Sequence, residues 1–571
     1  MTKQVVNIGD TGGAMVLKLA NNFNELYADA TYKTVADMVA ATGHAVGDTA
    51  RVINYSAACK SGPLTFIAVT SGTATPDGGS YINGSGVQWE QQFGSKIDAK
   101  SWGVGTPDTS DHTRWQSAID YVKNTLGGGE INFSGSSDIY ENVTMKNGVV
   151  IKGVMTYPSG YKANPSTGNA WGSKVFCHGD VGFLLSSGAV IDGLYIQKSD
   201  VTFPQTSLQS QSWTGTAISG DVSGSAVKNC MILGFERAID IGDPLVSGTS
   251  ARNLVDRVFI DCKNGVRISG SNDTDRIIDV TCWPFLSSVI TEADRAGTGI
   301  EGVNSDGRHI EGCFVFAYNK NYHCNDCNQW LMTNCGSDAD ITTTDATRKG
   351  LLVSGASSNV RVSTTRFTGK YETGIEIDMS DDNNGSNIAI SDCFFGSGAA
   401  TNQILITDGW YVSVSDSYLI TGTRGIRVSA DMGLKLSVDG CSFIGNGYPI
   451  SNAATLYNTN QLRWDSSNQI IAQQNNHTWE NANINTATVA SATNMAVPQN
   501  SDYILVTGTT TINALFNGVP NRIVVFSFTN GTTVNNGASI KTKSGSPVVY
   551  AAGDRAMYIC AGGAWFEVCK L

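Results

Sequence analysis

Apolar and polar residues alternate with a period of two over most of this chain, which predicts short strands. Seven segments share one frame: an alternating strand, a polar or Gly turn, an aromatic or aliphatic pair, a second turn, and a closing strand of the "GIEI" type. These segments are 225–243, 252–270, 308–326, 358–378, 386–408, 410–430 and 435–451. The frame therefore recurs every roughly 20 to 33 residues.

A strand repeat of this length without helices is typical of a coil in which each turn stacks on the previous one. A β-sandwich is the alternative, but it closes after about seven to nine strands, whereas this frame continues from residue 225 to 451. We therefore predict an all-β chain: a right-handed parallel β-helix (solenoid) with a small N-terminal domain and a C-terminal β-sandwich.

One stretch departs from this pattern and predicts an amphipathic helix near residues 111–126. Its apolar residues recur at helical spacing, at Trp115, Ala118, Ile119, Val122 and Leu126. Asp111 gives an N-terminal cap signal, and Gly127–Gly129 end the helix. Because the first turn of a coil exposes unpaired backbone groups, we expect this helix to cover the mouth of the coil.

The pattern divides the chain into three parts. Residues 1–95 predict a small β domain, with a short helix at 19–30. Residues 96–475 predict the β-helix. Residues 476–571 contain short, turn-bounded strands and predict a sandwich. The Asn-rich stretch 465–494 predicts a linker.

Composition narrows the classes of partner. The net charge is −12, with 15% charged residues spread along the chain, which argues against nucleic acid. The sequence contains no run of eighteen consecutive apolar residues, so it predicts no insertion into a membrane. The first residues, "MTKQVVNIGD", lack a secretory signal, so we expect synthesis in the cytoplasm. Abundant Asn, Ser, Thr, Gly and aromatic residues suit a hydroxyl-rich ligand such as a polysaccharide.

The thirteen cysteines predict buried free thiols. Six recur in a similar context within the repeat, at Cys230, Cys262, Cys313, Cys335, Cys393 and Cys441. Cys324 and Cys327 have metal-type spacing, with His323 and Cys335 close in sequence, but a structural zinc site needs a second pair of ligands. We favour thiols packed between strands, and we expect no metal and no cofactor.

Several motifs resemble a known family. The order "GVGTPDTSDHTRWQSAID…GGGEINFSG…DIYENVTMKNGVVIKG" resembles the first turns of the pectate-lyase-like β-helix of bacteriophage tailspikes, although "TPDTSDHT" departs from the commoner "GDGxxDDT". Residues 6–28 and 46–93 are similar to N-terminal segments of phage tail proteins. Residues 279–322 resemble the middle turns of capsule-degrading tailspikes, and residues 493–568 their C-terminal cap.

The resemblance implies a phage tailspike, a capsular polysaccharide depolymerase. It implies a homotrimer that is part of the virion (phage tail) and is assembled in the host cytoplasm. It further implies that residues 1–95 attach the protein to phage tail or baseplate proteins, that residues 96–475 contain a catalytic groove, and that residues 476–571 serve as a trimerisation or carbohydrate-binding cap. With three chains, the stretch 465–494 would be either a linker or a crossover of the chains. Its partner would be a bacterial surface polysaccharide, capsular or O-antigen, which it cleaves.

Hydrolysis of a glycosidic bond needs two carboxyl groups on opposite sides of the bond. Successive turns of a β-helix stack about 4.8 Å apart, so carboxylates spaced by one turn would face each other. Asp306, Asp338, Asp340 and Glu372 are spaced by 32 or 34 residues, and we predict that they form a catalytic column. The alternative is that they serve as turn and ladder residues.

Aromatic and polar residues near this column are candidates for substrate binding. The aromatic candidates are Trp283, Tyr318, Tyr322, Trp330 and Tyr371, because sugar rings stack on aromatic faces. Arg308 and His309 would hold the carboxylate of an acidic sugar, and Glu301 lies in an excursion, 287–303, over the groove. Alternation predicts that Phe314 and Phe316 belong to the core and that Tyr318 points outward.

Three functions therefore stay open: an endo-acting glycoside hydrolase, a polysaccharide lyase and a non-enzymatic adhesin. A lyase would require uronate in the substrate, a Tyr, His or Lys base, and cationic groups to neutralise the uronate. An adhesin would use the same groove as a binding platform.

Overall fold

The computed structural model describes residues 30–94, 96–108, 111–155, 172–201, 212–248, 250–285, 296–339, 348–369, 371–379, 387–396, 401–429, 435–446, 448–452, 462–464, 467–471, 486–498, 501, 503–518, 522–561 and 563–570. The chain divides into two compact units, Met1–Thr401 and Asn402–Leu571. Within the described ranges, no helix is both long and apolar enough to cross a membrane.

The first unit begins with a five-stranded sheet in the order β1-β2-β3-β5-β4. These strands are β1 (Ala30–Thr34), β2 (Thr49–Asn54), β3 (Leu64–Val69), β4 (Tyr81–Asn83) and β5 (Gln88–Gln91). Helix α2 (Val35–Ala40) starts at a capping box between Thr34 and Asp37 and packs Met38 against Phe66 and Trp89. Of the helix predicted at 19–30, residues 19–29 lie outside the described part of the chain.

Helix α3 (Asp111–Asn124) forms where the periodicity predicts it and contacts β7 (Gly129–Asn132), β8 (Ser136–Ile139), β9 (Val143–Thr144) and β10 (Val149–Lys152). Trp115, Ala118, Ile119 and Val122 are fully buried, so the predicted cover over the first turns is confirmed. Leu126 is 49% exposed, and its place in the apolar stripe was wrong. The reason is that the helix ends at Asn124 and the chain turns away through Gly127 at φ +80°.

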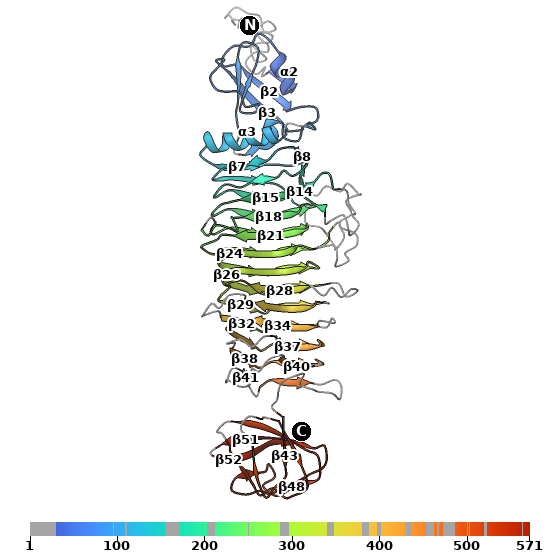
Figure 1. Cartoon of the computed structure of the whole chain (residues 1–571). Helices are drawn as coiled ribbons and strands as arrows, with labels where there is room; N and C mark the ends of the chain where they lie inside the picture. The colour runs from blue at the N-terminus through green and yellow to red at the C-terminus, as the bar shows by residue number, and fades with distance from the viewer. Residues whose placement is uncertain are drawn as a thin grey trace, which may run out of the picture. The chain divides into compact units, whose positions relative to one another are not determined.

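The predicted parallel β-helix is confirmed, and its strands are stacked turn on turn (Figure 1). The strand pairings give the turns of the first unit three faces. The first face contains β15 (Thr216–Gly220), β18 (Arg237–Ile241), β21 (Asn264–Ser269), the first halves of β24 (Thr298–Glu311) and β26 (Lys320–Thr333), β28 (Lys349–Ser354) and β31 (Thr373–Asp378). The second face contains β13 (Val190–Asp192), β16 (Ala226–Lys228), β19 (Leu254–Asp256), β22 (Asp275–Ile278), the second halves of β24 and β26, β29 (Val360–Ser363) and β32 (Asn387–Ser391).

The third face contains β8, β11 (Ser173–Cys177), β14 (Leu194–Lys198), β17 (Met231–Leu233), β20 (Phe259–Asp261), β23 (Thr281–Cys282), β25 (Phe314–Phe316), β27 (Gly336–Asp338), β30 (Arg366–Thr368) and β33 (Phe394–Phe395). Each strand pairs in parallel with the corresponding strands of the neighbouring turns. Each turn of the coil therefore passes through the first, second and third face in that order.

The corner between the second and third faces explains the recurrent cysteines. A residue with positive φ is followed there by a small buried residue, as in Asn229–Cys230, Gly312–Cys313, Asn334–Cys335 and Asp392–Cys393. Each of these thiols donates to a carbonyl of the preceding turn, for example Cys313 Sγ to Ile277 O at 3.5 Å. All thirteen cysteines are free and twelve are buried, which confirms that prediction, although Cys262 occupies a different corner.

The glycine of the repeated closing strand is required by close packing at the start of the first face. Gly265, Gly299, Gly350 and Gly374 precede the buried residues Val266, Ile300, Leu351 and Ile375. A Cβ on Gly299 would lie 2.3 Å from Val315 Cγ1 and 2.7 Å from Asn321 O. Two successive residues therefore point inward here, and the side chains on either side of them point outward.

The second unit contains further parallel turns and a separate β domain. Strands β34 (Asn402–Asp408), β37 (Arg424–Val428) and β40 (Tyr448–Asn452) pair in parallel, as do β35 (Tyr411–Ser415), β38 (Lys435–Asp439) and β41 (Leu462–Trp464). A third set consists of β36 (Tyr418–Ile420), β39 (Ser442–Ile444) and β42 (Gln469–Ile471). Of the expected linker, residues 472–485 lie outside the described part.

The C-terminal domain packs a six-stranded sheet against two small sheets around one core, as the predicted sandwich requires. Its strands are β43 (Thr486–Ala490), β44 (Asn494–Ala496), β45 (Tyr503–Thr507), β46 (Ala514–Phe516), β47 (Ile523–Phe528), β48 (Thr532–Val534), β49 (Ile540–Lys541), β50 (Val548–Tyr550), β51 (Arg555–Ala561) and β52 (Ala564–Lys570). The pairs β43–β45, β45–β47, β44–β46 and β49–β52 are parallel, whereas β47–β51, β48–β50 and β51–β52 are antiparallel.

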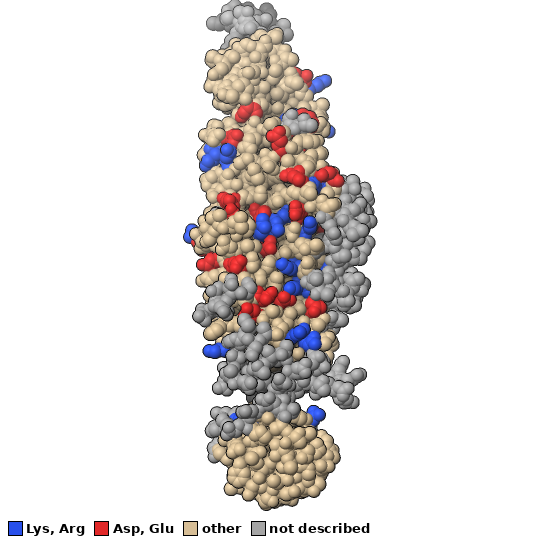
Figure 2. All heavy atoms as spheres, viewed as in Figure 1, with Lys and Arg blue, Asp and Glu red and all other residues tan. Residues whose placement is uncertain are grey.

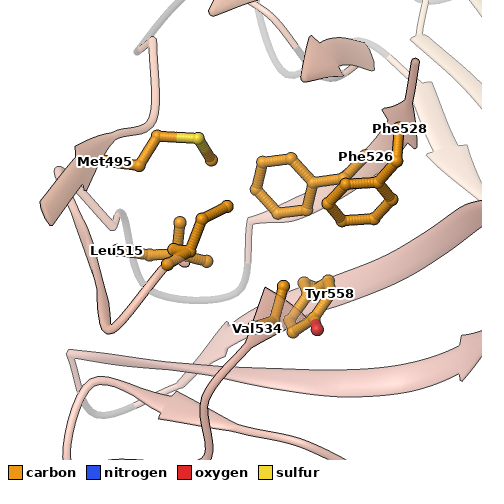
Figure 3. A pocket seen from close by; sticks show the side chains of 7 residues that line it. Met495, Leu515, Phe526, Phe528, Val534 and Tyr558 are labelled. Carbon is orange, nitrogen blue, oxygen red and sulfur yellow. The ribbon is translucent and has the colours of Figure 1, made fainter. Parts of the chain in front are cut away.

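A small apolar cavity of about 10 Å³ lies in this core between Met495, Leu515, Phe526 and Val534 (Figure 3). The cavity has only apolar lining, and a water needs about 10–15 Å³ together with polar partners. A sugar does not fit there, so the cavity is a packing defect of the core.

Candidate functional site

The corner at which the third face ends and the first face begins brings several of the predicted residues together. We call it the candidate corner. It consists of the connections 283–297, 317–319, 339–348 and 369–372, with the strand ends on either side. Parts of 283–297 and 339–348, including Asp340, and residue 370 lie outside the described residues.

Trp283, Phe316, Asp338 and Thr368 form an outward row along the third face at this corner. The Cα register pairs Phe316 with Asp338 and Asp338 with Thr368. The rings of Trp283 and Phe316 lie 4.4 Å apart at an interplanar angle of 45°. All four side chains are partly exposed. The row thus places an apolar aromatic surface beside a carboxylate, a combination that suits the apolar faces and the hydroxyls of a sugar.

The predicted burial of Phe314 and Phe316 was wrong, because the side-chain alternation is shifted by one residue. Val315 is fully buried and both phenylalanines point outward. Tyr318, which alternation placed outside, is fully buried. The non-glycine residue Ala317 has φ +60°, and this turn lets both Ala317 and Tyr318 point inward.

Four of the predicted aromatic binding residues lie inside the coil, so their assignment to substrate binding was wrong. Tyr318, Tyr322 and Trp330 are fully buried, and Tyr371 is nearly so. Tyr318 Oη donates to Cys262 O at 2.9 Å, and Tyr322 Oη lies 2.8 Å from Gly336 O. Burial raises the pKa of Tyr322 well above its ordinary value. The hydroxyl groups of Tyr318 and Tyr322 reach carbonyls within the coil, which makes burial of these tyrosines acceptable.

Arg308 is also buried, which contradicts its predicted contact with an acidic sugar. Its Nη2 lies 3.7 Å from Asp275 Oδ2, and its Nη1 donates to Ile268 O at 2.8 Å. Both charged side chains have no solvent exposure. His309 points outward on the second face, where its Cα partners are Arg276 and Leu331, so it is not part of the candidate corner.

Asp338 and Glu372 lie on adjacent segments of the candidate corner. Asp338 Oδ1 accepts from Ala339 N at 2.8 Å, and Glu372 Oε2 accepts from Thr401 Oγ1 at 3.0 Å. The preceding residue in each segment points inward, and Ser337 Oγ lies 2.8 Å from Tyr371 Oη. This buried hydroxyl contact holds together the two segments that carry the carboxylates.

The three described carboxylates of the predicted column, Asp306, Asp338 and Glu372, do not stack on one another. Asp306 lies between the two halves of β24 and stacks on Asn328. Asn328 Nδ2 donates to Asp306 Oδ1 at 3.0 Å. Asp338 stacks on Phe316 and Thr368, and Glu372 precedes β31. The turns differ in length because their connections differ, so a spacing of 34 residues does not correspond to one strand register.

The first face beside the candidate corner carries ion pairs that the sequence interpretation overlooked. Glu301 Oε2 lies 3.4 Å from Arg237 Nη1, and Glu301 Oε1 lies 3.2 Å from His323 Nδ1. Burial alone would raise the pKa of Glu301, but the His323 contact and the charge of Arg237 hold it below its ordinary value. Figure 2 shows acidic and basic groups interleaved over this face. The sequence does contain a signal for these ion pairs. In several closing strands, a charged residue directly follows the two residues that point inward.

The cysteine and histidine residues with metal-type spacing point in different directions. Cys324 and Cys327 are buried, whereas the ring of His323 faces outward between Glu301 and Ser354. Cys335 Sγ lies against Ile310 O at the opposite corner. In the ranges that the structure covers, no three His, Cys, Asp or Glu residues are arranged to hold a metal ion.

Comparisons with known proteins return phage tailspikes among solved structures. The capsular polysaccharide depolymerase gp49 of Acinetobacter baumannii bacteriophage Fri1 is 16% identical, with a TM-score of 0.43 over 78% of this chain and 76% of that chain. The gp42 tailspike of Acinetobacter phage vb_AbaP_AS12 is 12% identical, with a TM-score of 0.41 over 95% of this chain and 93% of that chain.

A mutant tailspike of E. coli bacteriophage HK620, in complex with a pentasaccharide, is 13% identical, with a TM-score of 0.41 over 74% of this chain and 75% of that chain. The solved structures found are thus of the kind that the sequence resemblance predicted. No family model and no curated protein sequence matches the chain.

Proposed function

We propose that this chain is a phage tailspike that binds a bacterial capsular or O-antigen polysaccharide and cleaves it by endo-glycosidic hydrolysis. The observation that carries the proposal is the outward row in which the Trp283–Phe316 aromatic pair is in register with Asp338. A partly exposed aromatic pair followed on the next turn by a carboxylate is a suitable surface for a sugar chain that lies along the coil.

In this proposal the Trp283–Phe316 pair holds a sugar ring, and Asp338 and Glu372 act on the adjacent glycosidic bond. One carboxyl group protonates the leaving oxygen, while the other acts as base or nucleophile on the opposite side. Asp338 and Glu372 are our candidates for these two roles, with Asp340 as a further candidate.

The proposal includes the assembly implied by the sequence resemblance. We propose that three copies form a homotrimer, that residues 1–95 attach it to tail or baseplate proteins of the virion, and that residues 476–571 act as a trimerisation or carbohydrate-binding cap. Light scattering of the purified full-length chain tests the trimer, because a monomeric mass would contradict it.

The test of the activity is mass spectrometry of purified capsular and O-antigen polysaccharides after incubation with the protein. We expect oligomers of whole repeat units that have gained one water. Asp338→Asn and Glu372→Gln should abolish them, whereas Asp306→Asn, a carboxylate outside the candidate corner, should leave them unchanged. Circular dichroism should show that all three variants remain folded.

The same experiment separates the alternatives. Oligomers without the added water, together with new absorbance from an unsaturated sugar, would identify a lyase. Intact polymer that stays bound to the protein would identify an adhesin. Full activity of both Asp338→Asn and Glu372→Gln would remove the catalytic assignment.

A further inference from the structure

Two outward columns run down the first face of the coil next to the candidate corner. One column contains Asp240, Arg267, Glu301, His323, Leu352 and Glu376, each in Cα register with the next. The other contains Thr298, Lys320, Lys349 and Thr373. Because rungs of a sheet are about 4.8 Å apart, Lys320 and Lys349 place two ammonium groups on adjacent rungs.

Each carboxylate in these columns already has a cationic partner. Asp240 accepts from Arg267 at 2.8 and 2.6 Å. Glu301 contacts Arg237 and His323. Glu376 Oε1 lies 2.6 Å from Lys349 Nζ.

Lys320 is the cation left over. Among the residues that the structure describes it has no ion-pair partner, although its side chain is only partly exposed. Burial and the charge of Lys349 lower its pKa, despite the opposing charges of Glu301 and Glu376. A half-buried ammonium group without its own counter-ion is poorly solvated, so an anion placed beside it would be stabilised.

Lys320 follows Phe316 by the short connection 317–319, so it lies just around the corner from the aromatic row. Its neighbours along the column are Thr298 and Lys349, and His323 Nε2 is paired with Ser354 Oγ at 2.9 Å. Four Lys or Arg side chains (Arg237, Arg267, Lys320 and Lys349) meet three carboxylates (Asp240, Glu301 and Glu376) here, so one positive charge is in excess.

We propose that Lys320 forms a subsite for the carboxylate of an acidic sugar, a uronic acid, in the polysaccharide that lies along the aromatic row. This inference rests on the proposed function and specifies its substrate class as an anionic polymer. A single excess positive charge matches a singly charged carboxylate better than a doubly charged phosphate. In this proposal Lys320, and not the buried Arg308, recognises the carboxylate of the acidic sugar.

Trace acetylation of lysines in the full-length protein, followed by peptide mass spectrometry, tests the subsite. The probes are D-glucuronate, glucose and inorganic phosphate, each at millimolar concentration with sodium chloride added to equal ionic strength. We expect glucuronate to slow acetylation of Lys320 at least threefold and glucose to leave it unchanged. Lys435, an exposed lysine in the second unit, is the matched control and should not respond to any probe.

Three results would overturn the proposal: no protection of Lys320 by glucuronate, equal protection by glucose, or equal protection of Lys435. Protection by phosphate alone would also contradict it, because the site would then recognise a phosphoryl group. As a second measurement, Lys320→Met should remove saturable glucuronate binding in saturation-transfer NMR, and Lys320→Arg should retain it. Neither measurement requires cleavage, so loss of the hydrolase assignment and loss of the subsite remain distinguishable.

Discussion

Replacing Asp111 with alanine should loosen helix α3 from the first turns of the coil. The Asp111 side chain is buried, and its Oδ2 accepts from Gly105 N and Ser137 Oγ, both at 2.9 Å. Its Oδ1 accepts from Arg114 Nη1 at 2.9 Å. Ser137 Oγ in turn accepts from Trp115 Nε1 at 3.0 Å. One carboxylate therefore links the start of the helix, its main apolar anchor and strand β8.

The expected loss of local stability follows from the groups that lose a partner when Asp111 is replaced. Removing one partner of a buried charged pair costs about 3–5 kcal/mol. Arg114 keeps Asp108, at 2.6 Å, so the lower part of that range applies to the charge, and the abandoned Gly105 amide adds about 1–3 kcal/mol if it stays dry. We expect the local free energy of opening to fall by about 3–6 kcal/mol, or about two to four and a half powers of ten in the opening equilibrium.

Hydrogen exchange of backbone amides in peptides covering Asp111–Asn124 measures this local opening. The β47 peptide Ile523–Phe528 in the C-terminal domain is the internal reference and should be unaffected. Asp120→Ala is the matched control, because Asp120 is on the same helix, is 40% exposed and pairs with Lys146 at 3.7 Å. That exposed pair contributes about 0–1 kcal/mol. An increase of less than tenfold for Asp111→Ala, or an equal effect of both variants, would refute the reasoning.

Three further predictions concern the coil. The pKa of Glu301 is held below its ordinary value of 4.5, so its stabilising contribution should be complete above that pH and lost as the pH falls through the lower folded value; Glu301→Gln should remove this dependence from acid unfolding curves. Val315→Ala should lower the free energy of unfolding by about 2 kcal/mol. Phe316→Ala should weaken polysaccharide binding in calorimetry and change the melting temperature little. A larger loss of stability for Phe316→Ala than for Val315→Ala would show that the inward and outward positions are assigned to the wrong residues. Gly299→Ala should lower the melting temperature, because the new Cβ would overlap Val315 and Asn321, and a wild-type melting curve would contradict the close approach at this corner.

The sequence by itself determined the repeated strand frame, the parallel coil and the cap helix, because these depend on local periodicity and turn residues. The period of two, the small residue after an Asn, Asp or Gly turn, and the 3.6-residue stripe at Trp115, Ala118, Ile119 and Val122 are local signals. The prediction for Leu126 was wrong because its exposure depends on where the helix ends, and Gly127 sets the turn that follows that end.

Only the tertiary structure decided which side chains face the solvent at the corners and which residues stack. One residue with positive φ, Ala317, reverses the expected faces of Phe316 and Tyr318. Unequal connections shift the register, so Asp338 stacks on Phe316 and Thr368 instead of on another carboxylate. The cluster around Glu301 and Lys320 likewise joins strands from different turns. Strand direction is a local property, but register sums every insertion between two turns, and for that reason the composition of a site on a coil emerges only when the turns are stacked.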